Sequence, residues 1–183
     1  MDASVRGGLF KVFVKSIRAN KTNVYDTLLE EDDKEIVNQL ILDSGWYPFK
    51  TYKNCVNAVA KVDADEATNI VEQWGYNAGK NLVNRVYKNI LRKKRIELAI
   101  KSYNQLFKLW FNFGVQKGEI ISDNELHISF EEFDSNFKFF YHLAKGWITS
   151  YFETYLNIKV NATFIKKSWE GADKTIIKLM WNS

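Results

Sequence analysis

A strong amphipathic pattern runs from Phe137 to Leu156. Its apolar residues recur at steps of three and four, as on a helix with one broad apolar face: Phe137, Phe140, Tyr141, Ala144, Trp147, Ile148, Tyr151, Phe152 and Tyr155. Asp134 offers an N-cap oxygen before this helix, and Asn157 tolerates a left-handed cap after it. Alternating apolar segments flank the helix on both sides. We therefore expect its aromatic face to lie across a β-sheet.

The chain before residue 110 has a helical period throughout. The pattern predicts helices over 5–19 (with a possible strand), 23–30, 33–42, 48–62, 65–91 and 96–110. The third of these is expected to bury Leu40, and the acidic run at Asp63–Glu66 is expected to start the fifth. Gly75 and Gly79 lower helix propensity by about 1 kcal/mol each. We expect another helix to approach closely there, with a bound ligand as the alternative.

After residue 110 the period changes to two, which is typical of strands. The pattern predicts strands over 110–116, 125–130, 158–165 and 175–181, with Gly118 in the first turn. The fold class is therefore α+β: N-terminal helices packed with a four-stranded antiparallel sheet, whose C-terminal half reads hairpin–helix–hairpin. We expect a single domain over 1–183, with a mainly helical part (1–109) and a part with the sheet and long helix (110–183).

The formal charge of +4 is unevenly distributed. Residues 66–110 carry 9 basic and 3 acidic side chains, with a peak at Lys88–Arg95. A local basic run of this kind is typical of a surface that binds a negatively charged partner. The apolar residues Ile90 and Leu91 within it instead favour a solvated helix corner, and no motif that reads nucleic acid accompanies the run. Nucleic-acid binding is therefore disfavoured.

The single cysteine, Cys55, excludes an internal disulfide and a cysteine-based zinc site, and we expect it to be a small buried hydrophobe. No signal peptide or membrane span is readable, so we expect a cytoplasmic protein.

Candidate chemistry is sparse. The two histidines, His127 and His142, belong to no metal-binding or catalytic motif, and no Ser/His/Asp order or phosphate-binding glycine loop is present. We therefore expect no catalytic residues, no metal site and no cofactor. Heme ligation by His142 is conceivable but disfavoured, because a lone histidine is usually structural or solvated.

Four segments follow one another in the order found in a known superfamily. They are Asp43-Ser44-Gly45-Trp46-Tyr47-Pro48, Trp74–Leu82 (WGYNAGKNL), His142–Trp147 (HLAKGW) and the closing stretch from Gly171 to Trp181. In these segments the chain resembles the superfamily of 4-vinyl reductase-type domains, heme–nitric-oxide-binding domains and vesicle-tethering TRAPP subunits. The likeness covers nearly the whole chain, and its motifs are specific for fold more than for function.

The resemblance implies helices packed on a four-stranded antiparallel sheet. Members of the superfamily often enclose a pocket for an apolar or lipid-like molecule, and several associate as dimers. Two departures limit what it implies. The cysteines typical of 4-vinyl reductase-type domains near the last hairpin are absent from Lys166–Thr175. The Tyr-x-Ser-x-Arg cluster of the heme-binding members is also absent.

We therefore expect a non-enzymatic binding or sensory module. Its predicted pocket is lined by Tyr52, Trp74, Phe140 and Trp147. A predicted self-association surface includes His142, Gly146 and Ser150, where the glycine would let a second helix pack, from the same subunit or from a partner.

Two alternatives stay open. One is a TRAPP-like protein-interaction module without a ligand, and the other, less favoured, is a heme-based gas sensor. The expected partners are a small apolar molecule and a second copy of the chain.

Overall fold

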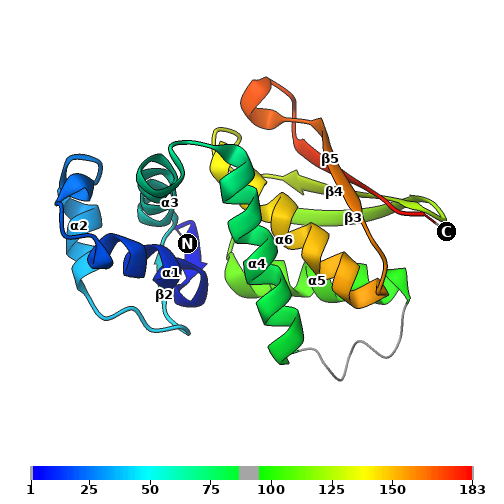
Figure 1. Ribbon diagram of the computed structural model, residues 1–183, viewed down its shortest axis with the longest axis horizontal. Helices are drawn as coiled ribbons and strands as arrows, with labels where there is room; N and C mark the ends of the chain where they lie inside the picture. Colours follow the sequence, from blue (N-terminus) through cyan, green and yellow to red (C-terminus); the bar gives the residue numbers. More distant parts are fainter. Residues whose placement is uncertain (1, 87–94, 183) are drawn as a thin grey trace. The chain divides into compact units, whose positions relative to one another are not determined.

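The computed structural model describes residues 2–86 and 95–182, with side chains described outside 82–86 (Figure 1). The chain divides into two compact units. Unit 1 contains Met1–Ala67 and Lys108–Phe113, and unit 2 contains Thr68–Phe107 and Gly114–Ser183. The prediction of a single domain over 1–183 stays a prediction. In the described part of the chain no helix is both long and apolar enough to cross a membrane.

Unit 1 is mainly helical. A short antiparallel pair joins β1 (Ser4–Arg6) to β2 (Trp46–Pro48), and around it lie α1 (Gly7–Ala19), the 3₁₀ helix η1 (Val24–Thr27), α2 (Glu31–Asn38) and α3 (Phe49–Ala64). Its core is aromatic: the ring of Tyr52 meets those of Phe10 and Phe13 edge-on, at 6.4 and 5.8 Å. The opening strand-plus-helix and the helix after Pro48 form as the sequence predicts.

The third predicted helix is shorter than expected. α2 ends at Asn38, and Gln39 leaves it in an extended conformation (φ −82°, ψ 160°). The guanidinium of Arg18 donates to the carbonyl oxygens of Val37 and Gln39, and these hydrogen bonds hold the backbone extended after Asn38. The prediction that Leu40 is buried is therefore wrong, since Leu40 is 77% exposed.

The acidic run at Asp63–Glu66 ends one helix instead of starting the next. α3 continues to Ala64, and Asp65 and Glu66 then take left-handed conformations (φ 47° and 58°). The next helix, α4 (Thr68–Val86), begins two residues later. The predicted acidic N-terminus is therefore wrong, because the left-handed conformations of Asp65 and Glu66 end α3 before α4 begins.

The first long strand begins later than predicted. β3 spans Val115–Ser122, whereas Phe111 bridges to Val5 of β1 and Phe113 packs on Phe49 at 4.6 Å. The strand-like pattern at 110–113 thus reflects burial in unit 1. Gly118 lies inside β3, opposite Ile128, and not in the turn. A Cβ there would lie 2.6 Å from a methyl carbon of Ile100 on α5.

Unit 2 has three layers (Figure 1). Its sheet is antiparallel in the order β3–β4–β6–β5, where β4 is Glu125–Glu131, β5 Asn161–Lys166 and β6 Thr175–Met180. The helices α5 (Ile96–Trp110) and α6 (Lys138–Leu156) lie on one face of this sheet, and α4 packs on the outer side of α6. The predicted α+β class with a four-stranded antiparallel sheet is confirmed.

The helix predicted over residues 137–156 is confirmed as α6, and Asn157 caps it in the left-handed conformation (φ 56°). β4 buries Leu126, Ile128 and Phe130 toward the helices, as its alternation predicts.

Candidate functional site

The inner face of α6 is an aromatic layer within unit 2. Trp147 stacks on Tyr151 at 5.4 Å with 13° between the ring planes, and Tyr103 of α5 closes on Trp147 at 5.2 Å. Two turns earlier, Phe140 packs on Phe133 at 4.5 Å. Trp147 and Phe140 are buried in this layer, which consists of aromatic rings from both helices and the sheet.

The four predicted pocket residues do not all belong to this layer. Phe140 and Trp147 lie in it, and Trp74 is half-buried on α4. Tyr52 belongs to the core of unit 1, where burial raises the pKa of its hydroxyl.

The opposite side of α6 packs against α4 at very short range. A Cβ on Gly146 would lie 1.9 Å from the carbonyl oxygen of Glu72, and one on Gly75 would lie 2.0 Å from that of Leu143. A Cβ on Gly79 would lie 2.3 Å from the hydroxyl oxygen of Ser150. The prediction that the mid-helix glycines of α4 admit another helix is therefore confirmed, and that helix is α6.

Ionisable groups meet at the same α4–α6 interface. The carboxylate of Glu72 pairs with the ammonium of Lys145 at 2.9 Å, and its oxygen lies 3.7 Å from Nδ1 of His142. This second distance is too long for a hydrogen bond. Nδ1 is buried without a hydrogen-bond partner among the described residues. Burial raises the pKa of Glu72, but His142 and Lys145 offset this and hold the pKa below its ordinary value.

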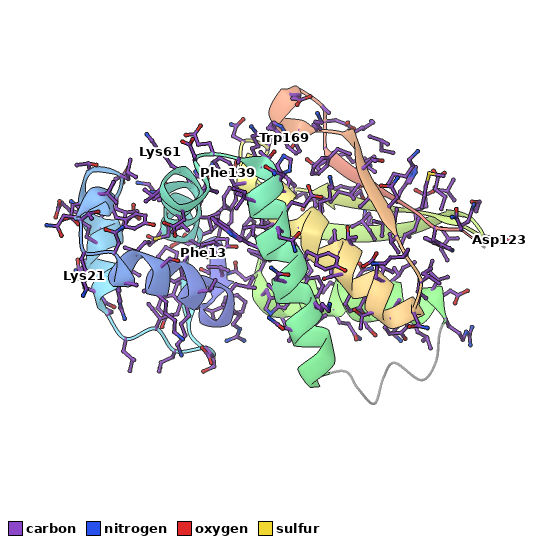
Figure 2. All side chains as sticks on the ribbon, viewed as in Figure 1. Phe13, Lys21, Lys61, Asp123, Phe139 and Trp169 are labelled. Carbon is purple, nitrogen blue, oxygen red and sulfur yellow. The ribbon has the colours of Figure 1, made fainter. Side chains whose placement is uncertain are left out.

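Two aromatic side chains from the sheet side, Phe164 and Trp169, lie against His142, and Phe164 also lies against Lys145. The ring of His142 lies edge-on to Phe164 at 5.1 Å and 5.7 Å from Trp169, which is labelled in Figure 2. The ammonium of Lys145 lies 5.2 Å from the centre of the Phe164 ring. The cluster of Glu72, His142 and Lys145 is thus a partly buried ionic contact between two helices. It contains no hydroxyl or thiol that a base could activate.

The three residues predicted for self-association all face α4. His142, Gly146 and Ser150 lie against Glu72 and Gly79 of the same chain. The sequence left open whether the second helix at Gly146 comes from the same subunit or from a partner. In the structure it is α4 of the same chain. Self-association stays a prediction.

Cys55 lies in unit 1, fully buried on α3. Burial, with a smaller contribution from Asp33, raises the pKa of its thiol to about 12. The thiolate that a nucleophilic role requires is therefore scarce near neutral pH.

Sequence reasoning missed Glu72, Lys145, Phe164 and Trp169. One signal was available for Glu72, because it lies three and seven residues before Gly75 and Gly79 and so shares their face of α4. The other three depend on which elements meet in space, and a period within one element does not carry that information.

No protein-family model matches the chain, and no curated protein matches it by sequence. Solved structures match over nearly its full length. An H-NOX protein from S. oneidensis in the Fe(II)NO ligation state has a TM-score of 0.66 at 13% identity, covering 97% of this chain and 99% of that one. Fe(II) unliganded H-NOX protein from K. algicida has a TM-score of 0.67 at 13% identity, covering 97% of both chains. The chain has an H-NOX-like fold.

A second kind of neighbour is similar to part of this chain. Trafficking protein particle complex subunit 3 from Naegleria fowleri, covalently bound to palmitic acid, has a TM-score of 0.55 at 16% identity and covers 72% of this chain and 93% of that one. The resemblance to heme–nitric-oxide-binding domains and TRAPP subunits is thus confirmed for the fold. Nothing in the comparisons supports its 4-vinyl reductase part.

These structures overturn the expectation that the chain takes no cofactor. That expectation rested on two isolated histidines and a missing Tyr-x-Ser-x-Arg cluster, whereas the H-NOX-like fold is shared with Fe(II) proteins and with one studied for heme distortion. Heme is therefore among the ligands to be tested.

Each of the two histidines lies beside a carboxylate. Nε2 of His127 lies 2.7 Å from a carboxylate oxygen of Glu125 on the same strand, and His142 is enclosed at the α4–α6 interface. Across residues 2–86 and 95–182, no three His, Cys, Asp or Glu side chains are grouped to hold a metal ion.

Proposed function

We propose that the chain is a non-enzymatic ligand-binding or sensory module whose ligand is apolar. The observation that carries the proposal is the H-NOX-like fold over 97% of the chain. Neighbours with this fold have been solved with iron-bound NO in one case and with covalently bound palmitic acid in another. The bound groups differ, and the shared fold is the common feature.

The aromatic layer of α6 supports an apolar ligand. Aromatic rings give a large apolar contact surface with few rotatable bonds, and Tyr and Trp add a polar edge. Within the layer the hydroxyl of Tyr155 is buried without a hydrogen-bond partner among the described residues, and so is Oε1 of Gln116 on β3. Buried polar atoms are normally paired, so each of these atoms is available to a bound water or ligand. We propose that Phe140 and Trp147 contact the ligand.

Binding is tested with the intact protein and two probes. Hemin titration followed by visible absorption should give a saturable, sharpened Soret band if the ligand is heme. Palmitic acid followed by native mass spectrometry and thermal shift should give a stoichiometric complex if the ligand is a fatty acid. Failure of both probes, together with no co-purifying small molecule, would contradict the proposal.

Variants then locate the ligand. Trp147→Leu and Phe140→Leu should each lower the affinity for the probe that binds the parent protein by about tenfold. Each substitution removes aromatic contact while keeping an apolar side chain. Trp181→Leu changes a half-buried tryptophan that follows β6, and as the matched control it should bind as the parent does. Equal affinities in all three variants would place the ligand elsewhere. Melting temperatures must accompany these measurements, because both layer residues are buried.

The second candidate is a protein-interaction module without a ligand, favoured by the similarity to the trafficking protein particle subunit. Sedimentation velocity at tens of micromolar distinguishes it. A homodimer that contains no bound small molecule and ignores both probes would favour this candidate. A ligand-bearing monomer would favour the first.

A further inference from the structure

We propose that unit 1 carries a docking surface for anionic membranes, formed by an apolar strip on α1, the segment before β2 and the first residue of β2. The strip consists of Val12, Leu40, Leu42 and Trp46. This proposal concerns unit 1 and does not depend on the ligand proposed above.

The strip is built by a segment that runs along α1. Residues 39–45 follow this helix in the opposite direction (Figure 1). The guanidinium of Arg18 donates to the carbonyl of Gln39, the ammonium of Lys11 pairs with Asp43 at 3.1 Å, and the amide of Gly7 donates to the carbonyl of Gly45. These three anchors fix the main chain of the segment against one side of α1.

The apolar side chains between the anchors point outward. Leu40 is 77% exposed, Val12 59%, Leu42 55% and Trp46 42%. The main chain at Leu40 and Leu42 is held by the hydroxyl of Tyr47, which donates to one carbonyl and accepts from the other residue's amide. Two large apolar side chains exposed on this ordered segment, with Val12 on α1 and Trp46 at the start of β2, mark an interaction surface.

Cations border the strip. Arg6, Lys11, Lys15 and Arg18 all lie on or next to α1, and no acidic residue lies between Ala3 and Tyr25. Asp43 pairs with Lys11. In the described part of the chain no carboxylate pairs with Arg6, Lys15 or Arg18, whose charges are therefore not neutralised. The guanidinium of Arg6 instead lies 4.0 Å above the ring of Trp46.

The positive charge of this border favours an anionic partner. An anionic lipid surface complements a cationic border, and each basic residue near such a surface adds about 1 kcal/mol, or about fivefold in affinity. A bilayer also accepts protruding leucine and tryptophan side chains without a preformed groove, and tryptophan is favoured at the headgroup level. A protein partner would need an acidic surface with matching hollows for Leu40 and Leu42.

Vesicle co-sedimentation tests the proposal with the full-length protein. Binding should be saturable on phosphatidylcholine vesicles with about 30% phosphatidylserine, negligible on phosphatidylcholine alone, and weakened at about 0.5 M salt. Leu40→Ser with Leu42→Ser should weaken binding at least tenfold, and Lys15→Glu at least fivefold.

Matched controls come from unit 2. Ile120→Ser with Ile121→Ser changes two residues that are 42% and 47% exposed, and Lys101→Glu makes the same charge change on α5. Both controls should bind vesicles as the parent does. Absence of binding to anionic vesicles would overturn the proposal, and so would equal losses in strip and control variants. Self-association that the strip variants abolish, without vesicle binding, would also overturn it.

Discussion

Single glycines determine how closely α4 and α6 approach. At Gly75, Gly79 and Gly146 the neighbouring backbone or hydroxyl occupies the space that a side chain would need. A glycine costs a helix about 1 kcal/mol, so the packing that it permits must offset that cost. The same residue type has no such role at Gly8, where the nearest atom to an added Cβ is 3.7 Å away.

We predict that Gly146→Ala lowers the free energy of unfolding by about 3 kcal/mol or more, because its methyl group would collide with the carbonyl of Glu72 and force the helices apart. Chemical denaturation measures the change. Gly8→Ala on α1 is the control and should be neutral or stabilise by up to about 1 kcal/mol. Equal stabilities in the two variants would contradict the close packing of α4 on α6.

Cys55 should resist thiol reagents in the folded protein. It is fully buried, and its thiol pKa of about 12 leaves almost no thiolate at pH 8. Labelling with a maleimide, followed by mass spectrometry, should be negligible in native buffer and complete in denaturant. Rapid stoichiometric labelling of the native protein would show that α3 opens readily.

Neighbouring strands of unit 2 are joined by one carboxylate. Glu131 on β4 pairs with Lys117 on β3 and, at 2.9 Å, with Lys174 next to β6. These ammonium groups lower the pKa of Glu131 to about 2 from an ordinary value of 4.5. A carboxyl group whose folded pKa is depressed stabilises the fold above its ordinary pKa and loses that contribution as the pH falls toward the folded value.

We therefore predict that Glu131→Gln lowers stability at pH 7 and that the difference from the parent shrinks as the pH falls from about 4.5 to about 2. Denaturant midpoints measured across this pH range supply the comparison. A difference that stays constant from pH 7 to pH 2 would show that the ion pairs of Glu131 do not contribute to stability.

Elements whose own period decides their structure could be predicted from the sequence. α5 begins and ends as predicted, α6 and β4 do so within one residue, and the close approach at Gly75 and Gly79 was also predictable. Element ends that depend on distant partners could not. α2 ends where the guanidinium of Arg18 donates a hydrogen bond to the carbonyl oxygen of Val37. β3 begins later than predicted because Phe111 is buried in unit 1.

The candidate site divides in the same way. Phe140 and Trp147 share a face of α6, so their common layer follows from helical spacing. The pairing of Glu72 with Lys145 does not follow from helical spacing. It depends on α4 packing against α6 with both helices running in the same direction. Tyr52 has an aromatic environment as predicted, but in unit 1.

At the scale of the whole molecule, unit 1 is completed by a distant part of the chain. Phe111 packs on Phe49 and Tyr52 at 6.4 and 6.3 Å, and its backbone bridges to Val5. Asn112 adds a hydrogen bond from the amide of Ser4 to its side-chain oxygen at 2.7 Å.

Phe111→Ala should therefore destabilise unit 1 by about 3–5 kcal/mol, the usual cost of removing a buried phenylalanine. Hydrogen exchange should show faster exchange in α1 and α3, which are remote from residue 111 in sequence. Leu109→Ala, at a position 58% exposed, is the control and should change stability by less than about 0.5 kcal/mol. Loss of protection confined to residues near 111 would contradict this role.

The return of residues 108–113 to unit 1 has a consequence for biosynthesis. A ribosome makes the N-terminal segment first, yet the ring that closes its core is added only after α4 and α5 have been translated. A nascent chain that stops short of Phe111 has an open apolar core between β1 and α3. Residues 1–67 therefore precede α4 and α5 in the chain, yet their core is completed only when residue 111 has been translated.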